Sequence, residues 1–86
     1  MDFHVFDTYV KAKDGHTMHF DVITDKKETE RAIVSAKQWL KSIGEENAKV
    51  TLEECRFCHS QTVPEEVEID ITTDGYFISK MEGCPQ

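Results

Sequence analysis

The sequence contains little of what marks a membrane, secreted or repetitive protein. Its 86 residues include two prolines and four glycines, and no repeat, linker or low-complexity tract interrupts them. No apolar run approaches the roughly 20 residues of a membrane-spanning helix. The first residues, MDFHVFD, carry acid where a signal peptide has lysine or arginine, so we expect the protein to stay in the cytoplasm.

Basic residues and cysteines are also scarce. Ten lysines and arginines face 17 aspartates and glutamates, for a formal net charge of −7. Such a field repels phosphate backbones and anionic membranes, so we expect no nucleic-acid partner and no membrane partner. Three cysteines are an odd number, and the reducing cytoplasm disfavours a disulfide framework. The thiols are then free, bound to a metal or redox-active.

The chain does have enough apolar side chains for one core. Hydrophobic residues make up 38% of it, and they include five Phe, two Tyr and one Trp. At this length the sequence predicts a single α+β domain over residues 1–86.

A β-hairpin opens the predicted fold. Residues 3–12 and 17–23 are rich in aromatic and β-branched types, and the Asp-Gly pair at 14–15 predicts a two-residue turn that places Tyr9 opposite Phe20. Because strand residues alternate between faces, this register defines two sets. The predicted core face holds Phe3, Val5, Tyr9, Met18, Phe20 and Val22. The other face holds His4, Phe6, Thr8, Val10, Thr17, His19, Asp21 and Ile23.

The later segments predict helix, strand, helix and strand. Residues 26–43 begin at a capping-box spacing, carry an apolar stripe and end before a glycine, as a long amphipathic helix does. Residues 49–53 predict a strand leading into the cysteine segment. Residues 64–73 have the end signals of a helix but the alternation of a strand, and we prefer the helix. A last strand at 76–81 completes the order β-β-α-β-α-β, a mostly antiparallel sheet covered by one long amphipathic helix.

The segment CRFCH at residues 55–59 matches the pattern used for covalent haem attachment. We rank haem last, because the attachment machinery usually works outside the cytoplasm. Zinc suits the C-x-x-C half better, since two such thiols form half of a tetrahedral site. The proposed metal ligands are Cys55, Cys58, His59 and Cys84, with His4 or His19 as an alternative imidazole.

Two other interpretations of the cysteine segment remain open. Thiol redox chemistry needs a thiol of low pKa, and no predicted helix begins close enough to the segment to lower one. The simplest interpretation is that the cysteines are small buried residues of the core.

A second candidate site lies on the predicted hairpin. There Thr8 faces Asp21, and His19 and His4 share the same surface, so that hydroxyl, imidazole and carboxylate groups could converge. No nucleophile-elbow or oxyanion-hole sequence accompanies them, so the sequence argues against an enzyme without excluding one. Asp7 is predicted on the core face, where a carboxylate is most often a hydrogen-bonded structural acid.

Four blocks of the sequence, HVFDTYVKAKDGHTMHFDV, AKQWLKSIGEE, ECRFCHSQ and GYFISKMEGC, together resemble a small bacterial family described as a domain of unknown function. They span nearly the whole chain. The resemblance implies an α+β fold of this size and a soluble bacterial protein, and it implies no activity, cofactor or catalytic residue. The family is more helical in the stretch that here reads PEEVEIDITTDG, which supports the helix there.

These observations predict a non-catalytic cytoplasmic binding or interaction module that can form a homodimer through the half-apolar hairpin face. The alternative is a zinc-binding or thiol-redox protein built on the cysteine segment with Cys84. We expect no cofactor unless that zinc site forms.

Overall fold

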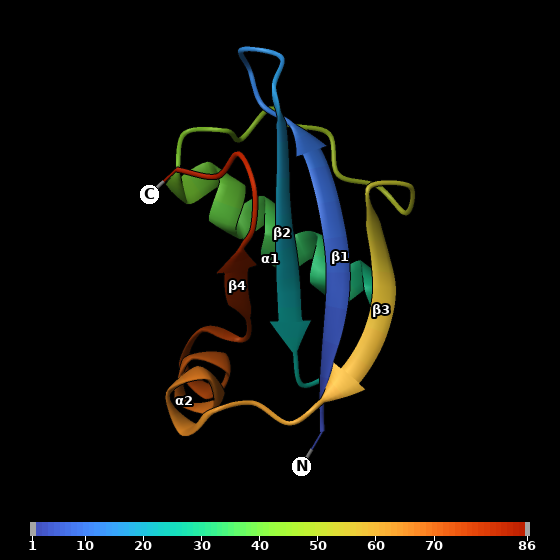
Figure 1. Ribbon diagram of the computed structural model, residues 1–86, viewed down its shortest axis with the longest axis vertical. Helices are drawn as coiled ribbons and strands as arrows, with labels where there is room; N and C mark the ends of the chain where they lie inside the picture. Colours follow the sequence, from blue (N-terminus) through green and yellow to red (C-terminus); the bar gives the residue numbers. More distant parts are fainter. Residues whose placement is uncertain (1, 86) are drawn as a thin grey trace.

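The computed structural model describes residues 2–85 and contains one four-stranded sheet and two helices (Figure 1). The elements are β1 (Phe3–Lys11), β2 (Thr17–Thr24), α1 (Thr29–Ser42), β3 (Cys55–Gln61), α2 (Glu65–Asp74) and β4 (Phe77–Lys80). The strands lie in the order β3-β1-β2-β4, and each neighbouring pair is antiparallel. The predicted α+β class and the order β-β-α-β-α-β are therefore confirmed.

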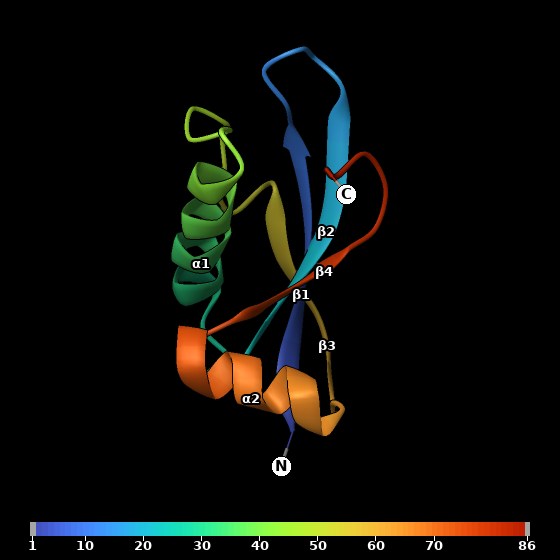
Figure 2. The ribbon, with the colours of Figure 1, turned by 90° about the vertical axis from the view of Figure 1, so that its left-hand side faces the viewer.

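The two helices cover different parts of the sheet. Figure 2 shows α1 standing along one face, where Leu40 and the rest of its apolar stripe pack on β1 and β2. Helix α2 lies across one end of the molecule, and its Ile71 packs with Phe3, Val5 and Ile23 on the other face. The prediction of a single long covering helix was thus correct only in part. No helix within residues 2–85 is long and apolar enough to cross a membrane.

Helix α1 is shorter than predicted at its N-terminus. The predicted start at residue 26 relied on a capping box, but the observed N-cap is Glu28, which makes no side-chain capping hydrogen bond. Instead the Thr24 hydroxyl donates to the Lys26 carbonyl over 2.6 Å and stabilises a bend before the helix. The local hydrogen bond therefore competes with helix formation over these residues.

The hairpin differs from its predicted register by one residue. The Ala12 N–H donates to the His16 carbonyl over 2.8 Å, and the Gly15 N–H donates to the Ala12 carbonyl over 2.9 Å, so the loop contains three residues. Gly15 adopts a φ of 96°, the left-handed conformation that a three-residue loop with a bulge requires. Tyr9 consequently pairs with His19.

This single shift moves every β1 side chain to the opposite face from the one predicted. Phe6, Thr8 and Val10 now lie with Met18, Phe20 and Val22 under α1. The face away from α1 carries Asp7, Tyr9, His19 and Asp21, which we call the open face. The half-apolar surface predicted for homodimer formation does not exist as one surface, because its members are divided between the two faces.

The third strand differs from its predicted position, whereas the second helix agrees with it. Residues 49–53 do not form a strand: the Thr51 N–H and hydroxyl both donate to the Glu54 carboxylate, over 2.8 and 2.5 Å, and make a turn. The strand is instead the cysteine segment itself. The helix at residues 64–73 is confirmed as α2, with Pro64 at its N-cap and Gly75 at its left-handed C-cap.

The C-terminal tail continues the sheet beyond β4 and is held against β2. The Met81 N–H donates to the His19 carbonyl over 3.0 Å, and the His19 N–H donates to the Glu82 carbonyl over 2.8 Å. The His16 ring nitrogens contact the Gly83 carbonyl, at 2.7 Å, and the Asp14 carboxylate. Both contacts favour the charged imidazolium, and together they raise the pKa of His16.

Substitution of Gly83 by alanine is expected to detach this tail. Gly83 has a φ of 74°, and a Cβ there would overlap the Thr17 carbonyl oxygen, so both strain and steric overlap oppose the change. We expect the half-buried Cys84, whose thiol donates to the His19 carbonyl over 3.4 Å, to react faster with an alkylating reagent. The rate is measured by mass spectrometry of the Cys84 peptide.

Gly75→Ala is the matched control for that experiment. Gly75 also has a positive φ, 90°, but an added Cβ would meet no atom within 4 Å. It should cost about 1 kcal/mol of stability and leave Cys84 protected. Equal alkylation rates of Cys84 in both variants would show that the close approach to Thr17 does not hold the tail.

Candidate functional site

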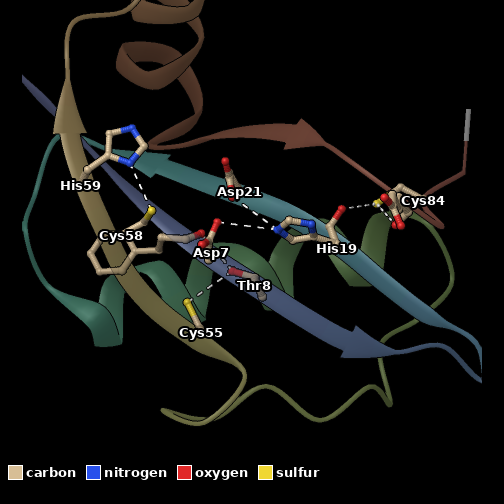
Figure 3. Close-up of polar contacts among 10 residues, drawn as sticks. Asp7, Thr8, His19, Asp21, Cys55, Cys58, His59 and Cys84 are labelled. Atoms are coloured by element: carbon tan, nitrogen blue, oxygen red, sulfur yellow. Dashed lines mark hydrogen bonds and ion pairs between the residues drawn. The ribbon is translucent and has the colours of Figure 1, made fainter.

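Asp7, His19 and Asp21 form a polar cluster on the open face. Asp7 lies in the middle of β1, and His19 and Asp21 occupy alternate positions of the neighbouring β2. The two-residue period of a strand therefore sends all three side chains to the same side of the sheet. Figure 3 shows them pointing toward one another from the two central strands.

The distances from the His19 ring to the two acids are too long for hydrogen bonds. His19 Nε2 lies 3.6 Å from Asp7 Oδ1 and 3.9 Å from Asp21 Oδ1. One ligand atom from each of the three side chains lies within 4.8 Å of the other two. Among residues 2–85, this is the one group of three or more His, Cys, Asp or Glu side chains that could hold a metal ion.

Two atoms of the cluster are buried without a hydrogen-bond partner among the described residues. They are His19 Nε2 and Asp21 Oδ1. The Asp21 residue is only 8% exposed, so water cannot fully solvate its carboxyl group. Buried polar atoms in folded proteins are normally satisfied, and an unsatisfied pair that faces a common point marks a functional candidate.

The two carboxyl groups have pKa values that move in opposite directions. The neighbouring carboxyl group of Asp21 is the main cause that lowers the pKa of Asp7. Burial is the main cause that raises the pKa of Asp21 to about 7, and the neighbouring carboxyl group of Asp7 adds to it. Two close carboxyl groups in a partly desolvated site thus favour holding one proton between them, and a cation can replace that proton.

Tyr9 orients the imidazole of the cluster. Its ring stacks on the His19 ring with the centroids 4.1 Å apart and the planes 8° from parallel. Tyr9 is itself 52% exposed, so it covers His19 on one side without closing the face. The stack restricts the ring and keeps Nε2 near the two carboxyl groups.

The candidate surface site predicted from the hairpin is divided between two faces. Thr8 is fully buried under α1, where its hydroxyl is 3.2 Å from the Phe6 carbonyl and 3.5 Å from Cys55 Sγ. His4 also lies away from the open face, and its Nδ1 contacts the Ser60 hydroxyl at 2.7 Å. Only His19 and Asp21 remain together, because the one-residue shift in register replaces Thr8 with Asp7.

The structure does not bring the four predicted metal ligands together. Cys55 is buried under α1, whereas Cys58 is exposed and lies beside Asp7 (Figure 3). His59 contacts the Cys58 thiol at 3.2 Å through Nδ1 and Gln61 at 2.6 Å through Nε2. The Cys84 thiol donates a hydrogen bond to the His19 carbonyl of β2. Strand β1 lies between β2 and β3, so Cys84 is separated from the cysteine segment. Cys55 and Cys58 point to opposite faces of the sheet, and Cys84 lies across the sheet from both of them.

Asp7 is the member of the cluster that the sequence did not assign to a site. The signal was present, since a carboxylate interrupts an otherwise apolar face of the predicted hairpin. With a three-residue loop in place of the two-residue turn, the same pattern places Asp7 directly opposite Asp21. The turn length alone decided whether Thr8 or Asp7 joined His19 and Asp21.

Comparison with known proteins identifies the class and the family of this small α+β domain. A search of the curated proteins finds no match. The family model described as a domain of unknown function, DUF2024, matches residues 1–81. The chain belongs to this family, which confirms the resemblance noted in its sequence blocks.

One similar solved structure is the NMR structure of protein NE1680 from the bacterium Nitrosomonas europaea, a structural-genomics target. It is 66% identical in sequence and has a TM-score of 0.89. The alignment covers 99% of this chain and 100% of that chain. The similarity extends over the whole fold, including the strands that carry the cluster.

Proposed function

We propose that this protein is a non-catalytic binding module whose open face binds a divalent transition-metal ion through Asp7, His19 and Asp21. The observation that carries the proposal is the pair of buried, unpartnered atoms, His19 Nε2 and Asp21 Oδ1, which lie 3.9 Å apart, with Asp7 Oδ1 3.6 Å from His19 Nε2. The proposal keeps the binding role predicted from the sequence and assigns it to three residues of the open face.

The spacing of the three ligand atoms fits such an ion. Ligands of a tetrahedral zinc ion, with bonds of about 2.0–2.2 Å, lie about 3.4 Å from one another. The distances of 3.6 and 3.9 Å from His19 Nε2 therefore need to close by only a few tenths of an ångström. Two carboxylates and an imidazole are donors that zinc, manganese and ferrous iron all accept.

The surroundings of the cluster support binding in preference to catalysis. The cluster lies on a sheet surface, and two grooves of the described residues lie elsewhere, one lined mainly by α1 and the other by α2. Catalytic sites usually need a concave pocket that orients a substrate and excludes water. A flat, partly exposed ion site suits storage, structural bridging or presentation of a metal.

Calorimetric titration of chelator-treated protein with zinc chloride and with manganese chloride tests this function. We expect one equivalent of ion to bind, because one set of converging ligands is present. His19→Ala and Asp21→Asn each remove one ligand and should weaken the affinity by about 100-fold or more. In nuclear magnetic resonance spectra, the His19 ring signals should shift on addition of zinc.

The hairpin loop supplies a matched control. Asp14 and His16 are an exposed aspartate and histidine in mutual contact, and His16→Ala should bind the metal as the unmodified protein does. Absence of stoichiometric binding by a folded chain at millimolar metal would overturn the proposal. Binding that survives Asp21→Asn but disappears in Cys55→Ser or Cys84→Ser would move the site to the cysteines.

A further inference from the structure

We infer that the Cys58 thiol is a fourth ligand of the metal site and makes that site selective for thiophilic ions such as zinc or cobalt over manganese. This inference rests on the proposed function of the Asp7–His19–Asp21 cluster. It assigns metal binding to one of the three cysteines, whereas Cys55 and Cys84 have structural roles only.

An irregularity of β3 places Cys58 near the cluster. Strand β1 pairs with β3 in one register at Phe6 opposite Phe57 and in another at Val5 opposite His59. Cys58 is the extra residue between these two pairs, which makes it the bulged residue of the edge strand. Bulges re-aim a side chain and often stand next to functional sites.

The Cys58 thiol lies beside the cluster and outside the group of three ligand atoms that lie within 4.8 Å of one another. Figure 3 shows Cys58 beside Asp7, on the same side of the sheet as His19 and Asp21. A cation held between Asp7 and Asp21 would attract the sulfur of a deprotonated Cys58 from this position.

The exposed position of Cys58 gives it the freedom that ligation requires. The Cys58 residue is exposed, and its thiol contacts His59 Nδ1 at 3.2 Å. Ligation needs a rotation about its first side-chain torsion, and this rotation gives up the contact with His59. Cys55, three residues earlier, has no such freedom, because its thiol is fully buried beside Thr8.

Ligation by Cys58 would change the chemistry of the site. As the sulfur–metal bond forms, the thiol proton leaves to solvent and the thiolate supplies the fourth donor of a tetrahedron. Thiolate is a soft ligand that suits zinc and cobalt, whereas manganese prefers oxygen. The two carboxylates and the imidazole alone would accept both zinc and manganese. With a thiolate as the fourth donor, the site should bind zinc more tightly than manganese.

Titration with cobalt(II), followed by absorption spectroscopy, tests the inference. The unmodified protein should develop a thiolate-to-cobalt charge-transfer band in the near ultraviolet together with visible bands typical of tetrahedral cobalt. Cys58→Ser should lose the charge-transfer band, weaken zinc binding by about 10- to 100-fold and leave manganese binding nearly unchanged. Cys55→Ser and Cys84→Ser are the matched controls and should keep the band.

The outcomes separate this inference from the function beneath it. If cobalt binds, and binding depends on Asp21, but no charge-transfer band forms, the metal site stands and Cys58 is not a ligand. A band that persists in Cys58→Ser also overturns the inference. If no ion binds at all, both the proposed metal site and the inference about Cys58 are wrong.

Discussion

Replacement of Phe6 by alanine is expected to destabilise the protein by about 3–5 kcal/mol, whereas replacement of Tyr9 should cost less than about 1 kcal/mol. Phe6 is 0% exposed and packs edge-on against Phe57, with the ring centroids 5.6 Å apart. Tyr9 is 52% exposed on the open face and packs mainly on His19. Since an ordinary domain has about 5–15 kcal/mol of stability, the first variant loses a large part of it.

Urea unfolding, followed by the fluorescence of the single tryptophan, measures both changes. Trp39 reports on the core because its ring lies 4.7 Å from that of Phe20. Phe6→Leu serves as a milder variant if the alanine variant does not fold, and it should show a smaller loss in the same direction. A Tyr9→Ala variant as destabilised as Phe6→Ala would support the two-residue turn and contradict the observed register.

Asp21→Asn is expected to stabilise the metal-free protein above neutral pH, by about 1–2 kcal/mol once screening by nearby solvent is allowed for. Burial raises the pKa of Asp21 to about 7 in the folded state, against an ordinary value of 3.8. Because the folded state holds its proton more tightly than the unfolded state, the contribution of Asp21 to stability is fully present below about pH 4 and declines as the pH rises through about 7. The amide group introduced by the substitution cannot ionise, so the variant avoids this decline.

Chemical denaturation between pH 4 and pH 8, with a chelator present, measures the effect. The two proteins should be nearly equal at pH 4 and diverge toward pH 8. Saturating zinc should reverse their order, because the unmodified protein binds zinc more tightly and gains more free energy from binding. Asp14→Asn is the control, since contacts with His16 lower the pKa of that exposed acid and its removal should not stabilise the protein. An Asp21→Asn variant less stable than the unmodified protein at pH 8 without metal would contradict this account of Asp21.

Local patterns in the sequence were sufficient to predict the elements and their order. The amphipathic stripe that includes Leu40 and the terminal signals at Pro64 and Gly75 correctly predicted the two helices. The strand after α1 was placed a few residues too early, because alternation at Val50 and Leu52 resembles a strand while Thr51 and Glu54 form a turn through their own hydrogen bonds.

The candidate site was harder to predict, since it depends on contacts between strands. A hairpin loop of two or three residues fits the same Asp-Gly signal, yet the choice decides whether Thr8 or Asp7 meets Asp21. The cysteine spacing was likewise uninformative without geometry. An extended strand with a bulge sends Cys55 inward and Cys58 outward, and no property of the five letters CRFCH fixes that conformation.

The bulge at Cys58 has a further consequence for how molecules of this protein meet in a concentrated solution. Strand β3 is an edge of the sheet, and a long regular edge is a template for aggregation by strand addition. An extra residue interrupts the even spacing of backbone groups and increases the local twist, so a second molecule cannot extend the sheet in an uninterrupted ladder. The same irregularity that turns a thiol toward the open face thereby helps to keep neighbouring chains apart.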